Sequence, residues 1–173
     1  MNYIQILNKI FSLGIIAMQI FAVIFLISII VKNRFAEYFK KNGLLIGFLL
    51  AFFALLISFF YSEIIGYPVC DLCWIQRVLM VVMLLSFGVS FFFKRKYFPE
   101  VGLISSILGV LVSIYHIFIE NGLSSKILCS VTNSVSCSIR YVYEFGYITI
   151  PIMALTLFII FILIFINNKK PLI

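Results

Sequence analysis

The sequence predicts an all-α membrane protein, a bundle of five transmembrane helices. Of its 173 residues, 64% are hydrophobic and 11% are charged, and the mean hydropathy is +1.22. Soluble domains usually have about a quarter of their residues charged, so an ordinary soluble fold is excluded. Five apolar stretches are each long enough to cross a bilayer core, which takes about 20 helical residues: 10–31, 44–65, 74–93, 101–119 and 147–166.

The first stretch, 10–31, follows Lys9 and resembles a signal peptide in that respect. However, the apolar run is too long for a signal peptide, and no small-residue cleavage site follows it. Cleavage would also leave four spans with the cysteines facing the reducing side of the membrane. We therefore interpret 10–31 as a true span, with the N-terminus outside and, after five spans, the C-terminus in the cytoplasm.

The second and fourth stretches carry small residues at helical spacing. In each stretch the small residues recur at steps of four, three and four: Gly47, Ala51, Ala54 and Ser58 in the second, and Gly102, Ser106, Gly109 and Ser113 in the fourth. Such stripes allow transmembrane backbones to approach closely. We therefore expect both helices to lie at packed interfaces, the alternative being a chance distribution of small residues.

The basic residues are distributed unequally between the two sides of the predicted bundle. Nine of the thirteen fall on one side: Lys32, Arg34, Lys40, Lys41, Lys94, Arg95, Lys96, Lys169 and Lys170. By the positive-inside rule that side is the cytoplasm. The opposite side holds the other four, with all the cysteines: Lys9, Arg77, Lys126 and Arg140. The formal charge of +7 thus reflects membrane topology, and no nucleic-acid partner is expected.

Two cysteines stand at the start of the third stretch, in "CDLCWIQR". They face the predicted oxidising side, where disulfides persist, and their spacing suits a small, easily reduced disulfide. If Asp71 caps the helix, Cys73 lies in its first turn, where backbone amides and the helix dipole favour a thiolate. The competing interpretation is a purely structural disulfide between Cys70 and Cys73.

Arg77 lies one helical turn from Cys73 on the same face. A guanidinium inside a span is costly unless it meets a polar ligand or reaches the interface. Next to a reactive thiol it could hydrogen-bond a quinone carbonyl and stabilise the anion that forms on reduction. Glu63, near the outer end of the second stretch, is either an ion-pair partner of Arg77 or, as we favour, a solvated interfacial acid.

His116 is the only histidine and lies about one turn from the outer end of the fourth stretch. Glu120 follows it on the same helical face. Because the third stretch enters and the fourth leaves on the outer side, His116 and Arg77 should lie at similar depth. His116 is then either an interfacial histidine without a role or a residue that delivers protons or contacts a ligand.

Cys129 and Cys137 enclose seven residues in a long polar connection. A mobile segment suits thiol–disulfide exchange, in which one thiolate must reach another disulfide. Four thiolates around zinc are the alternative, but structural zinc sites favour two tight pairs, and we predict no metal site. The following "SIRYVYEFG" predicts either a short helix on the membrane surface or an irregular loop.

These motifs together resemble the DsbB disulfide-oxidoreductase family, and its BdbC-like branch in particular. The segments that carry the resemblance are "CDLCWIQR", "YHIFIENG", "CSVTNSVSC" and "YVYEFGYITIPIMALTLF". The resemblance implies a four-helix transmembrane bundle of DsbB type (44–173), preceded by one extra N-terminal transmembrane helix with its cytoplasmic loop (1–43). The second cysteine pair is closer together than in the familiar Gram-negative form, and the extra helix has no assigned role.

The resemblance also implies a function. A protein of this kind lies in the bacterial cytoplasmic membrane, reoxidises a DsbA-like thioredoxin-fold oxidoreductase and passes the electrons to the membrane quinone pool, ubiquinone or menaquinone. A rival within redox chemistry is a vitamin K epoxide reductase-like enzyme, which the order of the two cysteine pairs disfavours. A rival from another class is a membrane scaffold whose disulfides only hold its outer loops together.

The family's functional residues carry over by position. The resemblance implies that Cys129 takes the partner's thiol in a mixed disulfide and that Cys137 then attacks Cys70. Contact with the quinone would fall to Cys73 as a thiolate, Arg77 and His116.

Overall fold

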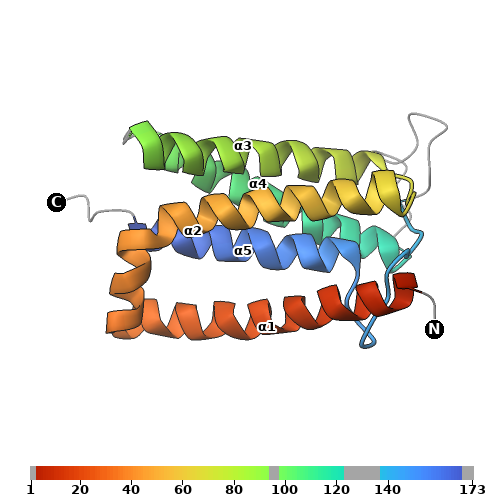
Figure 1. Ribbon diagram of the computed structural model, residues 1–173, viewed down its shortest axis with the longest axis horizontal. Coiled ribbons are helices and arrows are strands. Elements are labelled where there is room, and N and C mark those ends of the chain that lie inside the picture. The colour runs from red at the N-terminus through yellow and green to blue at the C-terminus, as the bar shows by residue number, and fades with distance from the viewer. Residues whose placement is uncertain (1–2, 94–97, 123–136, 169–173) are drawn as a thin grey trace.

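The computed structural model describes residues 3–93, 98–122 and 137–168, and they form a bundle of long helices (Figure 1). In chain order these are α1 (Tyr3–Val31), α2 (Arg34–Phe59), the short π-helix η1 (Phe60–Ile64) that continues α2, α3 (Asp71–Phe93), α4 (Phe98–Glu120) and α5 (Ile150–Asn168). Within these described ranges, five helices, with η1 counted into α2, are long and apolar enough to span a membrane. The predicted all-α membrane fold is confirmed.

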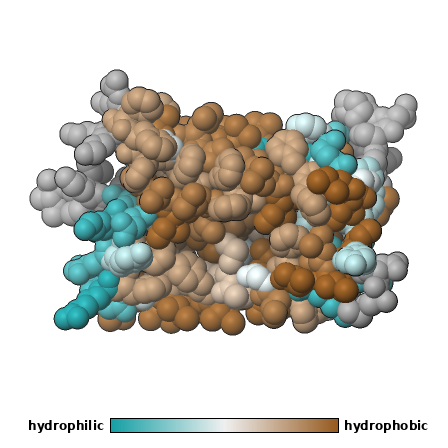
Figure 2. All heavy atoms as spheres, in the orientation of Figure 1, coloured by the Kyte–Doolittle hydropathy of each residue, from teal (hydrophilic) through white to brown (hydrophobic). Residues whose placement is uncertain are grey.

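The surface agrees with a membrane environment. On the face drawn in Figure 2, apolar side chains cover the middle of the bundle and hydrophilic residues gather toward its two ends. Figure 1 shows the start of α1 and the end of α5 at opposite ends of the bundle, as an odd number of spans requires. The ends of α2 and α4 and the starts of α3 and α5 meet at the same end as the N-terminus.

The connection between the first two spans is shorter than the sequence suggested. α2 begins at Arg34, so residues 34–43, which hydropathy assigned to a cytoplasmic loop, are helical. The Oδ1 atom of Asn33 accepts the N–H groups of Phe35 (3.1 Å) and Ala36 (3.3 Å) and caps the helix. Glutamate and lysine have good helix propensity although they lower hydropathy. Hydropathy alone therefore did not identify residues 34–43 as helical. Figure 1 shows these first turns crossing the end of the bundle.

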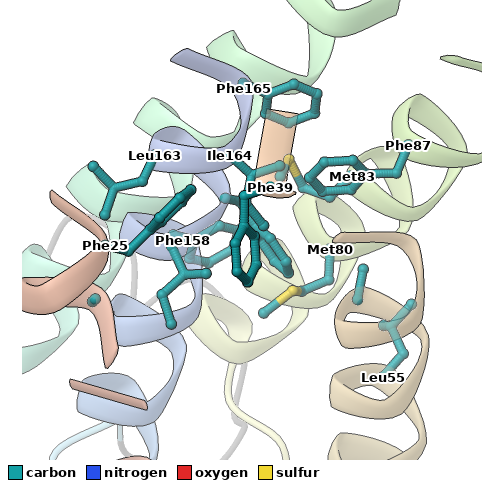
Figure 3. Close-up of a cluster of buried hydrophobic side chains, with 14 residues drawn as sticks. Phe25, Phe39, Leu55, Met80, Met83, Phe87, Phe158, Leu163, Ile164 and Phe165 are labelled. Carbon is teal, nitrogen blue, oxygen red and sulfur yellow. The ribbon is translucent and has the colours of Figure 1, made fainter. Parts of the chain in front are cut away.

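The bundle core is built mainly around α5. Figure 3 shows aromatic and aliphatic side chains from α1, α2, α3 and α5 converging on one another. The ring of Phe87 stacks on that of Phe165, with centroids 4.3 Å apart and planes 7° from parallel. Phe158 and Phe161 are fully buried. Close packing of this kind is what drives association between helices in a bilayer, where lipid is as apolar as the side chains.

The small residues of α2 and α4 lie at packed interfaces, as predicted. A Cβ atom added to Gly47 would lie 2.5 Å from Cε1 of Phe87, and one added to Gly109 would lie 2.5 Å from Cδ1 of Phe158. Gly102 faces Phe165 in the same way. These glycines therefore provide the space into which the core phenylalanines pack.

Replacing Gly109 with valine is expected to destabilise the bundle. The new side chain meets the buried ring of Phe158, and overpacking of a dense core costs about 1–3 kcal/mol. Thermal unfolding of the detergent-solubilised protein should show a lower midpoint for Gly109→Val. The control is Gly14→Ala on α1, where an added Cβ meets no atom within 4 Å; equal midpoints for the two variants would contradict the packing described.

The connections at the end of the bundle that carries Cys70 lie against each other through tyrosine rings. Tyr67, in the loop between η1 and α3, stacks on Tyr61 (centroids 5.8 Å apart) and on Tyr141 of the last connection (5.1 Å). Residues 137–149 form turns and one bridge between Glu144 and Ile148, so this segment is the irregular loop and not the surface helix. The tyrosine stack joins the loop after Cys137 to the loop before Cys70.

Candidate functional site

The first cysteine pair lies at the start of α3. Asp71 is the first residue of this helix, and the carbonyl of Cys70 accepts the N–H of Trp74 at 3.1 Å. Cys70 therefore occupies the position expected of Asp71, just before the first helical residue. Cys73 lies in the first turn, as predicted, so the positive end of the helix dipole acts on both sulfur atoms.

The two sulfur atoms of this pair are in contact. Cys70 and Cys73 are free thiols, joined by a hydrogen bond of 3.0 Å between their Sγ atoms. Nε2 of His116, on α4, lies 3.8 Å from Sγ of Cys70. His116 is 3% exposed and Cys70 is 5% exposed, so the imidazole and the thiol meet in a site largely protected from solvent.

These neighbours make Cys70 acidic. Its pKa is lowered to about 4, mainly by the hydrogen bond with Cys73; burial opposes this shift, and the hydrogen bond and charge of His116 add to it. The sequence placed the thiolate on Cys73, whereas in the reduced pair the ionised form of Cys70 is the one that these contacts favour. A thiolate at neutral pH is the reactive form in disulfide exchange.

The pH dependence of Cys70 alkylation tests whether the pKa of this thiol is lowered. Because the pKa lies far below the ordinary value of about 8.5, labelling of reduced protein by iodoacetamide should stay constant from alkaline pH down to about 5. It should fall as the pH passes through about 4. Mass spectrometry identifies the labelled cysteine.

Removing either neighbour should move that fall to higher pH. We expect Cys73→Ala to raise the Cys70 pKa more than His116→Ala, because the hydrogen bond with Cys73 is the larger cause. A wild-type profile that titrates near the ordinary thiol value would contradict the site as described.

Arg77 is held by polar and aromatic partners from α2 and by one aromatic side chain of its own helix. Its Nε donates to Oγ of Ser58 (2.9 Å) and its Nη2 to the carbonyl of the same residue (2.7 Å). The guanidinium also lies 5.0 Å from the ring centroid of Phe59 and 5.5 Å from that of Trp74. Neither bond involves Glu63, which is exposed, as favoured from the sequence. Only 8% of Arg77 is exposed, so it is a buried cation.

Some polar contacts of the site were not foreseen. The side-chain amide of Gln76 donates to Oγ of Ser113 at 3.0 Å, and this bond joins α3 to α4 next to the thiols. Ser58 was read only as a small packing residue, yet it is the acceptor for Arg77. The donors Gln76 and Arg77 are far in sequence from the serines that accept their hydrogen bonds. The sequence gave one signal for these contacts: "IQR" after the cysteines places two consecutive polar residues within an apolar span.

The second cysteine pair is described in part. Cys129 lies outside the described residues. Cys137 is disulfide-bonded and buried, and it packs in one cluster with Cys70, Leu72 and Ile119. The loop that carries it is tied to the end of α4 by Arg140, whose Nη2 donates to the carbonyl of Glu120 (2.9 Å) and to Oδ1 of Asn121 (2.8 Å). The structure thus brings a cysteine of the second pair against the first.

These residues surround one cavity of about 560 Å³. Helices α1, α2 and α5 form most of its walls, and the wall residues are largely apolar. The polar and thiol-bearing residues gather at one end: Cys70, Cys73, Gln76, Arg77, His116, Glu120 and Cys137. All the predicted site residues that the structure describes therefore face the same space.

The reduced thiols also offer ligands for a soft metal ion. The ligand atoms of Cys70, Cys73 and His116 all lie within 4.8 Å of one another. The four-thiolate zinc site weighed from the sequence needs Cys137 as a thiolate, and a disulfide-bonded Cys137 does not supply one. The geometry therefore fits a redox pair better than a zinc cluster.

Comparison with known proteins places the chain in a family. Residues 40–167 match the family model "Disulfide bond formation protein DsbB". A probable disulfide formation protein of Oceanobacillus iheyensis is 40% identical over 69% of this chain and 83% of its own length. Disulfide bond formation protein C of Bacillus subtilis is 33% identical over 76% and 91%. No solved structure gives a significant match. The chain belongs to the DsbB family of disulfide bond formation proteins.

Proposed function

We propose that this protein is a membrane thiol–disulfide oxidoreductase that reoxidises a DsbA-like thioredoxin-fold partner and passes the electrons to a membrane quinone. One observation carries the proposal: a single cavity is lined by the first cysteine pair, by Cys137 of the second pair, by the buried Arg77 and by the only histidine of the sequence. A scaffold with structural disulfides has no need of reduced, contacting thiols beside a buried cation.

The cavity fits a quinone in size and in chemistry. Its volume of about 560 Å³ is in the range of about 300–1,000 Å³ typical of small-molecule pockets. A guanidinium has five N–H donors, and Ser58 takes two of them, so others remain for a ring carbonyl. A bound quinone supplies an acceptor for two electrons and two protons. Arg77 would hold it, and the apolar walls would exclude water.

The thiols move electrons by exchange of disulfides. A thiolate of the partner attacks Cys129 of the second pair, and Cys137 leaves as a thiolate. Cys137 then attacks Sγ of Cys70 when the first pair is oxidised; the Cys70–Cys137 bond forms, the Cys70–Cys73 bond breaks and Cys73 becomes the thiolate. The packing of Cys137 against Cys70 suits this step. The second thiol of the partner displaces Cys129 and forms the partner's disulfide, and the Cys129 thiolate attacks Cys137, so that the Cys129–Cys137 bond is restored and Cys70 leaves as a thiolate.

Two groups are suited to handling protons. Nδ1 of His116 is buried and, among the described residues, has no hydrogen-bond partner, while Nε2 faces Cys70. Glu120 lines the same end of the cavity. We propose that His116 holds the proton released by a thiol, since an imidazole can accept at one nitrogen and donate at the other.

The orientation in the membrane follows from the charges. Lys32, Arg34, Lys40 and Lys41 lie at the connection of α1 with α2, at the end of the bundle away from the cysteines. The positive-inside rule assigns this end to the cytoplasm. We propose that the active cysteines face the outside of a bacterial cytoplasmic membrane, where partner proteins receive disulfides.

The test is quinone reduction by a protein dithiol. Purified protein is mixed anaerobically with oxidised quinone and a reduced thioredoxin-fold oxidase, and the ultraviolet absorbance of the quinone is followed. One quinol should form for each dithiol oxidised. No change of quinone absorbance with any dithiol would overturn the proposal.

A further inference from the structure

α1 lies outside the segment that matches the family model, residues 40–167, yet it forms a wall of the cavity. Ile10, Phe11, Gly14, Ile15 and Met18 all line it. Their spacing places them on one face of the helix over about 12 Å, at 1.5 Å of rise per residue. The neighbouring residue Leu13 does not line the cavity.

Polar side chains fix α1 in this position. The hydroxyl of Tyr61 donates to Oδ1 of Asn8 (2.9 Å) in a buried contact. Further along, the amide of Gln19 donates to Oγ1 of Thr156 (3.3 Å) and accepts from the hydroxyl of Tyr147 (2.7 Å). These bonds join α1 to η1, to α5 and to the last connection, so its lining face is held at a fixed register.

The cavity continues from Arg77 along the bundle, away from the thiols. α1 and α5 run away from the end that carries the cysteines and α2 runs toward it (Figure 1), so Met18, Leu50 and Leu157 mark the far end of the lining. Three small residues, Gly14, Ala54 and Ala154, line the space between the three helices. A Cβ added to Gly14 would meet nothing within 4 Å, so this part is open and apolar.

We propose that α1 completes the acceptor site by holding the hydrocarbon tail of the quinone in this apolar channel. The inference rests on the proposed function and adds an element to it. The ring would lie at Arg77 and the tail between α1, α2 and α5. A polar-headed molecule with a long apolar tail matches a cavity that is polar at one end and apolar along its length. α1 thereby selects for tailed quinones.

Quinone binding can be measured without turnover. Trp74 is the only tryptophan of the chain and lies 5.5 Å from the guanidinium carbon of Arg77, so a quinone at Arg77 should quench its fluorescence. Titrations compare a benzoquinone that carries a decyl tail with the same ring without a tail. The variants are Gly14→Ala, Gly14→Leu and Gly14→Phe, which fill the channel progressively, and Leu13→Phe is the matched control on the outer face of α1.

The expected result is a graded, tail-specific loss of affinity. Gly14→Phe should raise the Kd of the decyl quinone roughly tenfold, in the range that steric overfilling produces, and Gly14→Leu should raise it less. The Kd of the tail-free ring should change less than about twofold, and Leu13→Phe should bind both as the wild type does. Gly14→Leu keeps the test valid if the largest side chain impairs folding, and Gly14→Ala, whose added Cβ meets nothing within 4 Å, should bind the decyl quinone nearly as the wild type does.

Two outcomes count against the inference, and they can be told apart. If the wild type binds the decyl quinone while the Gly14 variants that fold bind it equally well, the role of α1 is wrong and the proposed function stands. If neither quinone binds to the wild type, the proposed function fails and takes this inference with it.

Discussion

Replacing Cys73 with serine is expected to lower quinone reduction by a partner dithiol by about a thousandfold or more, since loss of a reacting thiol removes the pathway itself. Serine cannot form the disulfide with Cys70, so Cys137 has no bond to attack and no thiolate is left beside Arg77. The serine hydroxyl would also take the place of the thiol that contacts Sγ of Cys70 at 3.0 Å. Steady-state quinone absorbance under anaerobic conditions measures the effect.

The matched control for this variant is Val78→Ala on the same helix. Val78 is 57% exposed in the bundle and faces away from the cavity, so its rate should remain near that of the wild type. A Cys73→Ser protein that is folded and reduces quinone at more than a tenth of the wild-type rate would show that electrons take another route.

Replacing Arg77 with alanine is expected to lower kcat/KM for quinone by roughly 10- to 100-fold. Hydrogen bonds that involve a charged group are worth about 1.5–3 kcal/mol, and the variant loses both the charge and the donors at the end of the cavity. Most of the change should appear in KM, because Arg77 binds the quinone ring. Arg77→Lys should be intermediate, since an ammonium keeps the charge but not the planar set of donors.

A second measurement separates quinone binding from thiol exchange in the Arg77 variant. The first oxidation of a partner dithiol by the oxidised protein needs no quinone, so Arg77→Ala should perform this single turnover at the normal rate. Arg34→Ala, an exposed arginine at the opposite end of the bundle, serves as the charge control. Equal loss of both half-reactions in Arg77→Ala would mean that Arg77 supports the fold and not the acceptor.

Features that depend on local sequence were predictable. The last three spans are long apolar runs, and the bilayer requirement alone locates each of their ends to within three residues. The first two spans begin seven and ten residues before the predicted stretches, because their first turns are helical but less apolar. The spacing of Cys73 and Arg77 on one helix places them on one face whatever the neighbours are, and Cys70 directly precedes that helix. The glycine stripes predicted close packing because a missing side chain leaves room for any partner.

Features that depend on contacts between distant segments were not predictable. Nothing near Arg77 in sequence indicates that Ser58 accepts its hydrogen bonds, and nothing near Gln76 points to Ser113. The ionisation preference of Cys70 depends on His116, 46 residues away, as well as on its helix. The start of α2 was missed for another reason: its charged first turns are helical but not apolar, and hydropathy responds only to the second property.

In the proposed function, the thiols of Cys70 and Cys73 give their electrons to a quinone in the adjoining cavity. The most direct measurement uses fully reduced protein, without any partner, mixed anaerobically with one equivalent of oxidised quinone. Quinol formation, remaining thiols and the position of the new disulfide are determined on the same sample. The proposed function predicts one quinol for each disulfide formed, with the Cys70–Cys73 bond appearing first. Quinone that stays oxidised while all four thiols remain titratable would contradict it.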